Sequence, residues 1–222
     1  MKWQRTRILA ALALAGVAWA QTPIDETKPV GPKASIDITN INGKVEVEAW
    51  DRNEIHVTGT LGRNTEKLEF THEDGETEIK VVVPRFGWHV GETILFINAP
   101  AGNSVRASSV SGGVEVRGIK ADVEISSISG SVRATGCAGT IQAESVSGSV
   151  HLDGDFTECE ATSVSGSVHV KTVRDEVRAK SVSGSIEVEG VTPKKIECET
   201  NSGSVSYTGG LAPDAKLEAS TH

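Results

Sequence analysis

The sequence has few basic residues for its number of acids. It contains 22 Lys and Arg residues against 30 Asp and Glu residues, and Lys2, Arg5 and Arg7 fall within the first twenty residues, which hold no acid. The remaining chain therefore has 19 basic and 30 acidic side chains, a formal net charge of −11. A nucleic-acid-binding protein needs a basic face that replaces counterions on phosphates, and anionic lipid head groups attract basic segments. This balance excludes nucleic acid and anionic membranes as main partners.

Long apolar runs are also missing. The only apolar run near the N-terminus, residues 8–17, is shorter than the roughly 20 residues that a membrane-spanning helix needs. It follows a basic start and precedes Ala18-Trp19-Ala20, a small-x-small sequence typical of a signal peptidase site. Residues 1–20 are therefore predicted to be a signal peptide, which exports the chain to the periplasm or cell surface and leaves no transmembrane anchor after cleavage. An uncleaved anchor is the alternative.

Motifs of catalysis are absent. The sequence has no G-x-S-x-G nucleophile elbow and no H-E-x-x-H zinc motif. Polysaccharide-active β-helix enzymes need acids and bases in a groove walled by long loops, and the coils between residues 105 and 207 have no insertion of that size. We therefore expect a protein that is not an enzyme and needs no cofactor, with a polysaccharide-active enzyme as the alternative.

A repeat of 18 residues dominates the second half of the sequence. The unit S-V-S-G-S-V, with small variations, begins at Ser109 and recurs through residue 205. Its glycines follow at spacings of 18, 18, 18, 18 and 19 residues: Gly112, Gly130, Gly148, Gly166, Gly184 and Gly203. A fixed period of this length indicates stacked coils, each of which buries its apolar residues only against its neighbours.

Each unit holds two short segments with apolar residues at every second position, which predicts two strands and no helix. Val146, Gly148, Val150 and Leu152 form one such alternating series and are predicted to face the interior. Stacking the units in parallel register aligns apolar residues at the strand spacing of about 4.8 Å. Three ladders result: Val105, Val123, Ile141, Cys159, Val177, Ile196; Val114, Val132, Val150, Val168, Ile186, Val205; and Val116, Ala134, Leu152, Val170, Val188, Tyr207. The fold class is predicted to be all-β, a parallel β-solenoid of the right-handed β-helix type.

The rest of the chain departs from this period. Residues 35–103 alternate like strands and hold most of the aromatic residues, so we expect irregular N-terminal coils that cap the regular repeats of residues 104–222 within one domain, 35–222. Residues 21–34, with Pro23, Pro29 and Pro32, are predicted to be an exposed leader. No cap is visible at the C-terminus. Either the sequence is truncated there, or the last coil is covered by another copy.

Three cysteines, Cys137, Cys159 and Cys198, are too few and too far apart to form a disulfide framework. Their odd count leaves at least one thiol unpaired. In the 18-residue register, Cys137 lies about 13 Å from Cys159, and Cys159 and Cys198 are two coils apart, beyond the usual Cα separation of a disulfide. We predict three free thiols, with Cys159 and Cys198 buried and Cys137 in a bend.

These residues resemble a known family. The recurrent S-G-S-V turns, together with I-T-N-I-N-G-K-V-E-V-E-A-W-D at residues 38–51, are similar to the bacterial domain-of-unknown-function family called "putative adhesin". The resemblance extends from about residue 35 to the end. It implies a β-helical, exported or cell-envelope protein, and it supplies no catalytic residues.

Two sets of surface side chains are candidates for binding. Ser129, Ser147, Ser165 and Ser183 recur at one position and are predicted to form an outward row that could contact a polysaccharide or ice. Serine beside glycine also serves bends by satisfying backbone groups, which is the simpler interpretation.

The second candidate is the pair His151 and His169, predicted one coil apart within rows of alternating charge and near Asp153. Two imidazoles and one carboxylate on an open face do not complete a zinc site, so we predict no metal. Protonation of both rings below pH 6 would be mutually unfavourable.

The sequence as a whole predicts a non-enzymatic envelope protein, either structural or adhesin-like, that presents flat β-faces to glycan or protein. A self-stacking scaffold, associating end to end through its last coil, is a third hypothesis.

Overall fold

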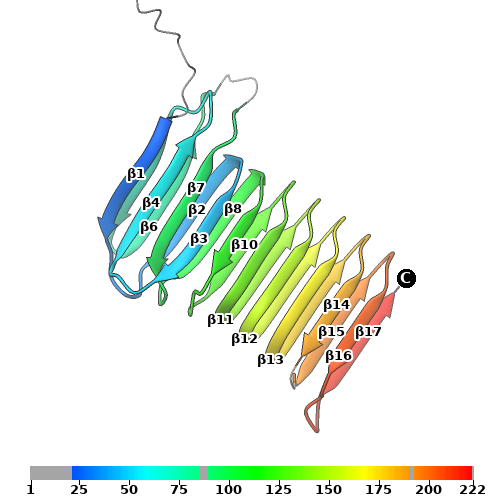
Figure 1. Cartoon of the computed structure of the whole chain (residues 1–222). Coiled ribbons are helices and arrows are strands. Elements are labelled where there is room, and N and C mark those ends of the chain that lie inside the picture. The colour runs from blue at the N-terminus through cyan, green and yellow to red at the C-terminus, as the bar shows by residue number, and fades with distance from the viewer. Residues whose placement is uncertain (1–21, 86–89, 191–192, 222) are drawn as a thin grey trace, which may run out of the picture.

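The chain forms a stack of β-coils (Figure 1), seen here in a computed structural model that describes residues 22–85, 90–190 and 193–221. The predicted signal peptide, residues 1–20, lies outside the described residues. Across the described ranges every regular element is a strand, and none forms a helix that could cross a membrane. The predicted all-β class, a parallel β-solenoid with a strand-rich N-terminal cap, is confirmed.

Two sheets face each other across the core, and each coil contributes a strand to both. The first sheet contains, in spatial order, β1 (Thr22–Pro29), β4 (Glu54–Leu61), β7 (Ile94–Pro100), β3 (Val45–Trp50), β9 (Val114–Arg117), the first halves of β11 (Val132–Ser145), β12 (Val150–Ser163) and β13 (Val168–Ser181), β14 (Ile186–Gly190) and β16 (Val205–Gly209). The second contains β5 (Lys67–Glu73), β6 (Glu76–Val82), β2 (Ser35–Asn42), β8 (Ser104–Ser111), β10 (Val123–Ser127), the second halves of β11, β12 and β13, β15 (Lys195–Thr200) and β17 (Lys216–Thr221). The long strands β11–β13 pass from the first sheet to the second through register shifts.

The N-terminal coils are not stacked in chain order. β2 pairs with β6 on one side and β8 on the other, and β3 likewise lies between β7 and β9. The coil made by β6 and β7 therefore lies outside the coil made by β2 and β3, although it comes later in the sequence. Three antiparallel strands, β1, β4 and β5, finish this end. β4 and β5 belong to the predicted cap of residues 35–103, and β1 adds a strand to it from outside that range.

The expectation of an exposed leader at residues 21–34 is wrong. Residues 22–29 form β1, which pairs antiparallel with β4 along its whole length. Ile24, Val30 and Ala34 are buried. Pro23 and Pro29 are tolerated because β1 pairs on one side only, and an edge strand can lack N–H donors on its free side.

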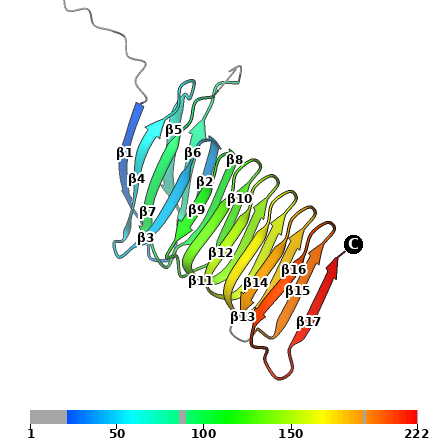
Figure 2. The same ribbon diagram turned by 45° about the vertical axis from the view of Figure 1, so that its right-hand side comes forward.

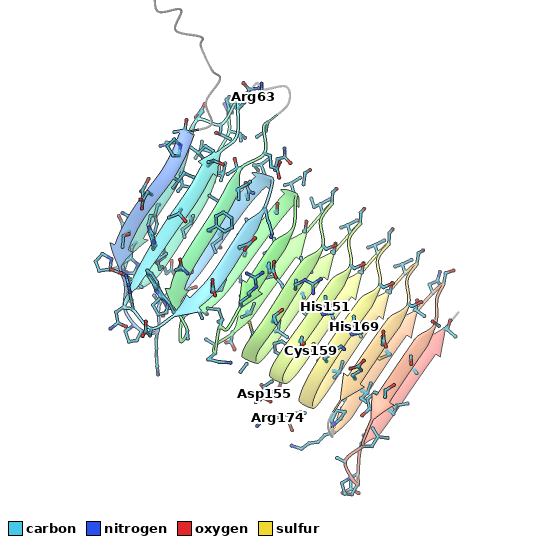
Figure 3. All side chains as sticks on the ribbon, viewed as in Figure 1. Arg63, His151, Asp155, Cys159, His169 and Arg174 are labelled. Atoms are coloured by element: carbon cyan, nitrogen blue, oxygen red, sulfur yellow. The ribbon has the colours of Figure 1, made fainter. Side chains whose placement is uncertain are left out.

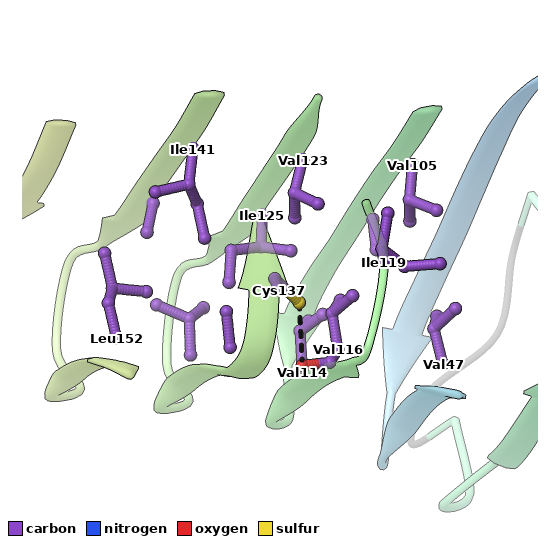
Figure 4. Packing of buried hydrophobic residues seen from close by; sticks show 14 of the residues in the cluster. Val47, Val105, Val114, Val116, Ile119, Val123, Ile125, Cys137, Ile141 and Leu152 are labelled. Atoms are coloured by element: carbon purple, nitrogen blue, oxygen red, sulfur yellow. Dashed lines mark hydrogen bonds between the residues drawn. The ribbon is translucent and has the colours of Figure 1, made fainter. Parts of the chain in front are cut away.

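The three predicted ladders form the core. Each listed residue pairs with its equivalent one coil away, and all are buried except Val205 and Tyr207 in the last coil, which are partly exposed. Figure 4 shows Val116, Ile125 and Ile141 filling the space between the two sheets. The interior is narrow because many inward positions hold Val or Ala.

The repeat glycine is required by the neighbouring coil. A Cβ atom on Gly148 would lie 2.2 Å from the carbonyl oxygen of Gly130, and one on Gly166 would lie 2.2 Å from that of Gly148. The sequence suggested crowding against the facing sheet or a backbone kink as the reason. The cause is instead the close approach of successive turns along the stack.

Candidate functional site

The first serine of each S-V-S-G-S unit is an internal latch. Ser145 and Ser163 are buried, at 3% and 1% exposure. The Oγ–H of Ser163 donates to the carbonyl oxygen of Gly148 in the preceding coil (3.0 Å), and its oxygen accepts from the N–H of Gly166 (2.9 Å). Ser145 makes the same two bonds, to Gly130 and from Gly148. These serines join adjacent turns and are unavailable to a ligand.

The apolar residue that follows this serine points outward, so the prediction that Val146 and its equivalents face the interior is wrong, whereas the second valine of the unit, Val150, is buried as predicted. We call the outward-pointing side chains the apolar ridge. Its members, each with its exposed fraction, are Val110 (40%), Ile128 (51%), Val146 (45%), Val164 (41%) and Val182 (46%). The turns that carry them lie side by side along one long edge of the stack, the edge at which the last strand, β17, ends (Figure 2). Backbone hydrogen bonds fix the register, for example from the N–H of Ser147 to the carbonyl oxygen of Ile128 (2.9 Å).

The candidate serines Ser129, Ser147, Ser165 and Ser183 come next in the chain, and all four are exposed. They run parallel to the apolar ridge, one per coil. The strip formed by ridge and serines contains no charged side chain. Its hydroxyl groups are accessible, and their role in binding stays a prediction.

The imidazoles of His151 and His169 lie against each other on β12 and β13 (Figure 3). Their ring centroids are 4.9 Å apart and their planes differ by 3°. Nδ1 of His169 lies 2.9 Å from a carboxylate oxygen of Glu187. Burial, and after it the positive charge of Arg133, lowers the pKa of His151. Within the described ranges no three metal-ligating side chains cluster, so the pair is a stack of rings with one carboxylate partner.

An open polar groove of about 830 Å³ lies on the outer face of the second sheet, and sequence reasoning missed it. It crosses β5, β6, β2, β8, β10 and the second half of β11, close to the cap. Its lining carries hydroxyls, an amide, one guanidinium and six carboxylates: Ser35, Asp37, Thr71, Glu73, Glu76, Thr77, Glu78, Ser104, Arg106, Asp122, Glu124, Thr140 and Gln142. Arg106 is paired with Glu124 at 2.8 Å. Small side chains at Ser35 and Ser104, between strands bearing acids, leave this part of the face hollow.

Carboxyl groups with a shifted pKa are shifted downward. A lysine partner is the largest cause for Glu46, Glu69 and Glu176, through Lys44, Lys67 and Lys195 respectively. A general acid needs the opposite shift, toward neutral pH. These three groups are therefore suited to ion pairs on the outer faces, two of them between near neighbours along the chain and one, Glu176 with Lys195, between neighbouring strands.

The three cysteines are free thiols, as predicted. Cys159 and Cys198 are buried, and burial raises the pKa of both, that of Cys198 to about 11. Cys137 is also buried and lies within β11, not in a bend. A register shift pairs it with Gly154 instead of Asp155, and its Sγ–H points to the carbonyl oxygen of Val116, 3.7 Å away (Figure 4).

The sequence model of one family, Toastrack DUF4097, matches residues 33–222. The chain belongs to the Toastrack DUF4097 family. The match begins just before β2 and covers every later strand, so the resemblance predicted from the S-G-S turns is confirmed. No curated protein matches the chain.

Solved structures resemble this chain at low sequence identity. A "putative adhesin" from Bacteroides fragilis NCTC 9343 is 14% identical, covers 90% of this chain and 98% of its own, and has a TM-score of 0.55. A "putative cell adhesion protein" from Clostridium sporogenes ATCC 15579 is 13% identical, with 85% and 100% covered and a TM-score of 0.45. A "putative lipid binding protein" from Parabacteroides distasonis ATCC 8503 is 14% identical, with 90% and 97% covered and a TM-score of 0.45.

Of the surface features of this Toastrack chain, two could be placed from the sequence and two could not. It placed the serine row and the histidine pair correctly, because both follow directly from the 18-residue register. It assigned the apolar ridge to the core, and it could not find the groove, which depends on how β5 and β6 flank the first coils. A signal for the ridge was nevertheless present: a β-branched residue recurs between two serines in five successive coils.

Proposed function

We propose that this Toastrack chain is a non-enzymatic, adhesin-like binding module that is exported to the cell envelope and holds a glycan there. The observation that carries the proposal is the open polar groove. Its hydroxyl, amide and carboxylate groups are hydrogen-bond partners for sugar hydroxyls. Its concave shape can surround part of a ligand, which a flat β-face cannot do. The structural relative named as an adhesin, with a TM-score above 0.5, supports the same function. The serine row offers a second, shallower surface for the same polymer.

Export follows from the predicted signal peptide, and an envelope location gives the groove access to glycan. The three carboxyl groups whose pKa is lowered by a lysine partner lie outside the groove lining and form ion pairs on the outer faces. A polysaccharide-active enzyme remains the alternative function. End-to-end association through β17, which is exposed along its whole length, stays a prediction.

The test is co-sedimentation of the purified mature chain with insoluble peptidoglycan sacculi. Ser104→Phe would place a ring on the floor of the groove and should abolish retention. Ser126→Phe is the matched control, because it adds the same ring to the outer face of the same sheet outside the groove lining. A double variant, Ser147→Ala with Ser165→Ala, tests the serine row.

Retention that survives Ser126→Phe and is lost with Ser104→Phe supports the groove. Retention lost only with the serine double variant would move the site to the serine row. A chain that retains neither sacculi nor soluble envelope polysaccharide removes the proposal. Release of new reducing ends from the sacculi would favour the enzyme alternative.

A further inference from the structure

The apolar ridge is the part of this acidic chain where a second copy can approach without repulsion. The full sequence has a formal net charge of −8, so two copies repel each other in most orientations. Five successive turns, residues 109–113, 127–131, 145–149, 163–167 and 181–185, contain only Ser, Val, Ile and Gly. The apolar side chains project from the middle of this uncharged strip.

The spacing of the ridge restricts what can contact all of it. Its side chains follow one another once per coil, at the strand spacing of about 4.8 Å. Only a surface with the same period can touch every member in an equivalent way, as identical side chains do where paired sheets interdigitate. A second copy of the same coil stack has this period by construction.

We propose that two copies of this chain pair ridge to ridge, antiparallel, about a two-fold axis that passes beside Val146. In this arrangement Val110 of one copy lies against Val182 of the other, and Ile128 lies against Val164. The antiparallel direction also keeps the two carboxylate-rich grooves at opposite ends of the dimer. A parallel pair would place both at the same end of the dimer.

The association stops at the dimer, and it is weak. A two-fold contact uses the same surface on both copies and leaves no ridge free, so it ends at the dimer. Five partly exposed side chains bury less than the roughly 800 Å² per partner of a standard stable interface. The dimer therefore depends on concentration. If the groove binds glycan as proposed above, the dimer holds two grooves at once and gains avidity on a polymer.

Sedimentation velocity of the mature chain over about a hundredfold concentration range tests the dimer without any glycan. We expect a shift from monomer to dimer as the concentration rises. Val146→Glu brings two carboxylates together at the two-fold axis and should weaken the dimer by at least about tenfold. Thr157→Glu is the matched control, because it adds the same charge at an exposed position of β12 outside both the apolar ridge and the groove lining, and it should leave the dimer unchanged. Thermal melts of each variant verify that it is folded.

The pairing rule is tested with Ile128→Lys and Val164→Glu. Each single variant should dimerise less than the wild type, and an equimolar mixture should recover a dimer, because position 128 of one copy meets position 164 of the other. A parallel contact would pair position 128 with itself and would give no recovery.

Three results would overturn the proposal. The first is a chain that stays monomeric at every concentration. The second is a dimer that tolerates Val146→Glu and is lost with Leu217→Glu, which would assign association to the end of the stack. The third is a monomer that sediments with phosphatidylcholine vesicles and loses this binding with Val146→Glu, which would make lipid the occupant of the ridge.

Discussion

The buried serines Ser145 and Ser163 each satisfy two backbone groups from two different coils. In Ser163 one hydroxyl both donates to the carbonyl oxygen of Gly148 and accepts from the N–H of Gly166. Both backbone groups lie in turns, where no ladder partner replaces the serine. Thr200 fills the equivalent position in a later coil and donates to the carbonyl oxygen of Gly184 at 3.0 Å. The requirement is thus for a small hydroxyl at this position.

Ser163→Ala is expected to destabilise the fold by about 1–3 kcal/mol, because it leaves a buried N–H and a buried carbonyl unsatisfied. Ser163→Thr should retain most of the stability, as Thr200 does in its own coil. Ser165→Ala, at an exposed position two residues away, should change stability by less than about 0.5 kcal/mol. Urea denaturation of the three variants measures the difference. Equal effects of Ser163→Ala and Ser165→Ala would contradict the latch.

At this scale the sequence predicted the register but not which side each residue of the motif faces. Alternation with a period of two holds only while the strand stays extended. The backbone bends between Ser145 and Ser149, so Val146 does not share a face with Val150, although the two are four positions apart, an even offset. The core ladders beyond the bend were predicted correctly because β11–β13 are extended there.

Whether a segment forms a strand depends on its neighbours in the stack as much as on its composition. β1 contains two prolines and three charged residues, a composition typical of a loop, and it nevertheless forms the edge of the first sheet. Because β1 pairs only with β4, it needs fewer N–H donors than a central strand. Prolines on its free side hinder the pairing of another strand there. Propensity alone could not have predicted this strand, because its existence depends on β4 offering an antiparallel edge.

Ionisable side chains on neighbouring strands also affect one another, and through His151 on β12 they make the stability of the fold depend on pH. Its folded-state pKa lies below the ordinary value of 6.5, chiefly through burial and then through Arg133. The unfolded chain therefore binds more protons as the pH falls through that value, so the stability present above pH 6.5 is lost progressively below it.

Melting temperatures of the wild type and His151→Gln, measured between about pH 8 and pH 5, test this coupling. The wild type should lose more stability than the variant as the pH falls. A variant that loses as much stability as the wild type would show that another group controls the acid sensitivity.

The whole molecule separates its features along the stack. The cap and the polar groove lie at the N-terminal end, and the apolar ridge runs along one edge of the regular coils. The 18-residue period predicted this regular part almost completely, since each ladder depends only on spacing. The capped end could not be predicted in the same way, because β6 and β7 are placed outside β2 and β3 against the order of the chain.

Each regular coil holds its first serine inward and the apolar side chain that follows it outward, and from Ser127 to Ser181 that serine is a latch to the preceding coil. Thiol labelling tests it across the stack, with single cysteine substitutions at the ridge positions Val110, Ile128, Val146, Val164 and Val182 and at the preceding serines Ser109, Ser127, Ser145, Ser163 and Ser181. The background is low, because the native cysteines are at most 3% exposed. We expect thiols at the ridge positions to react in the folded protein and thiols at the serine positions to react only on unfolding. Reactive serine positions with protected ridge positions would contradict it.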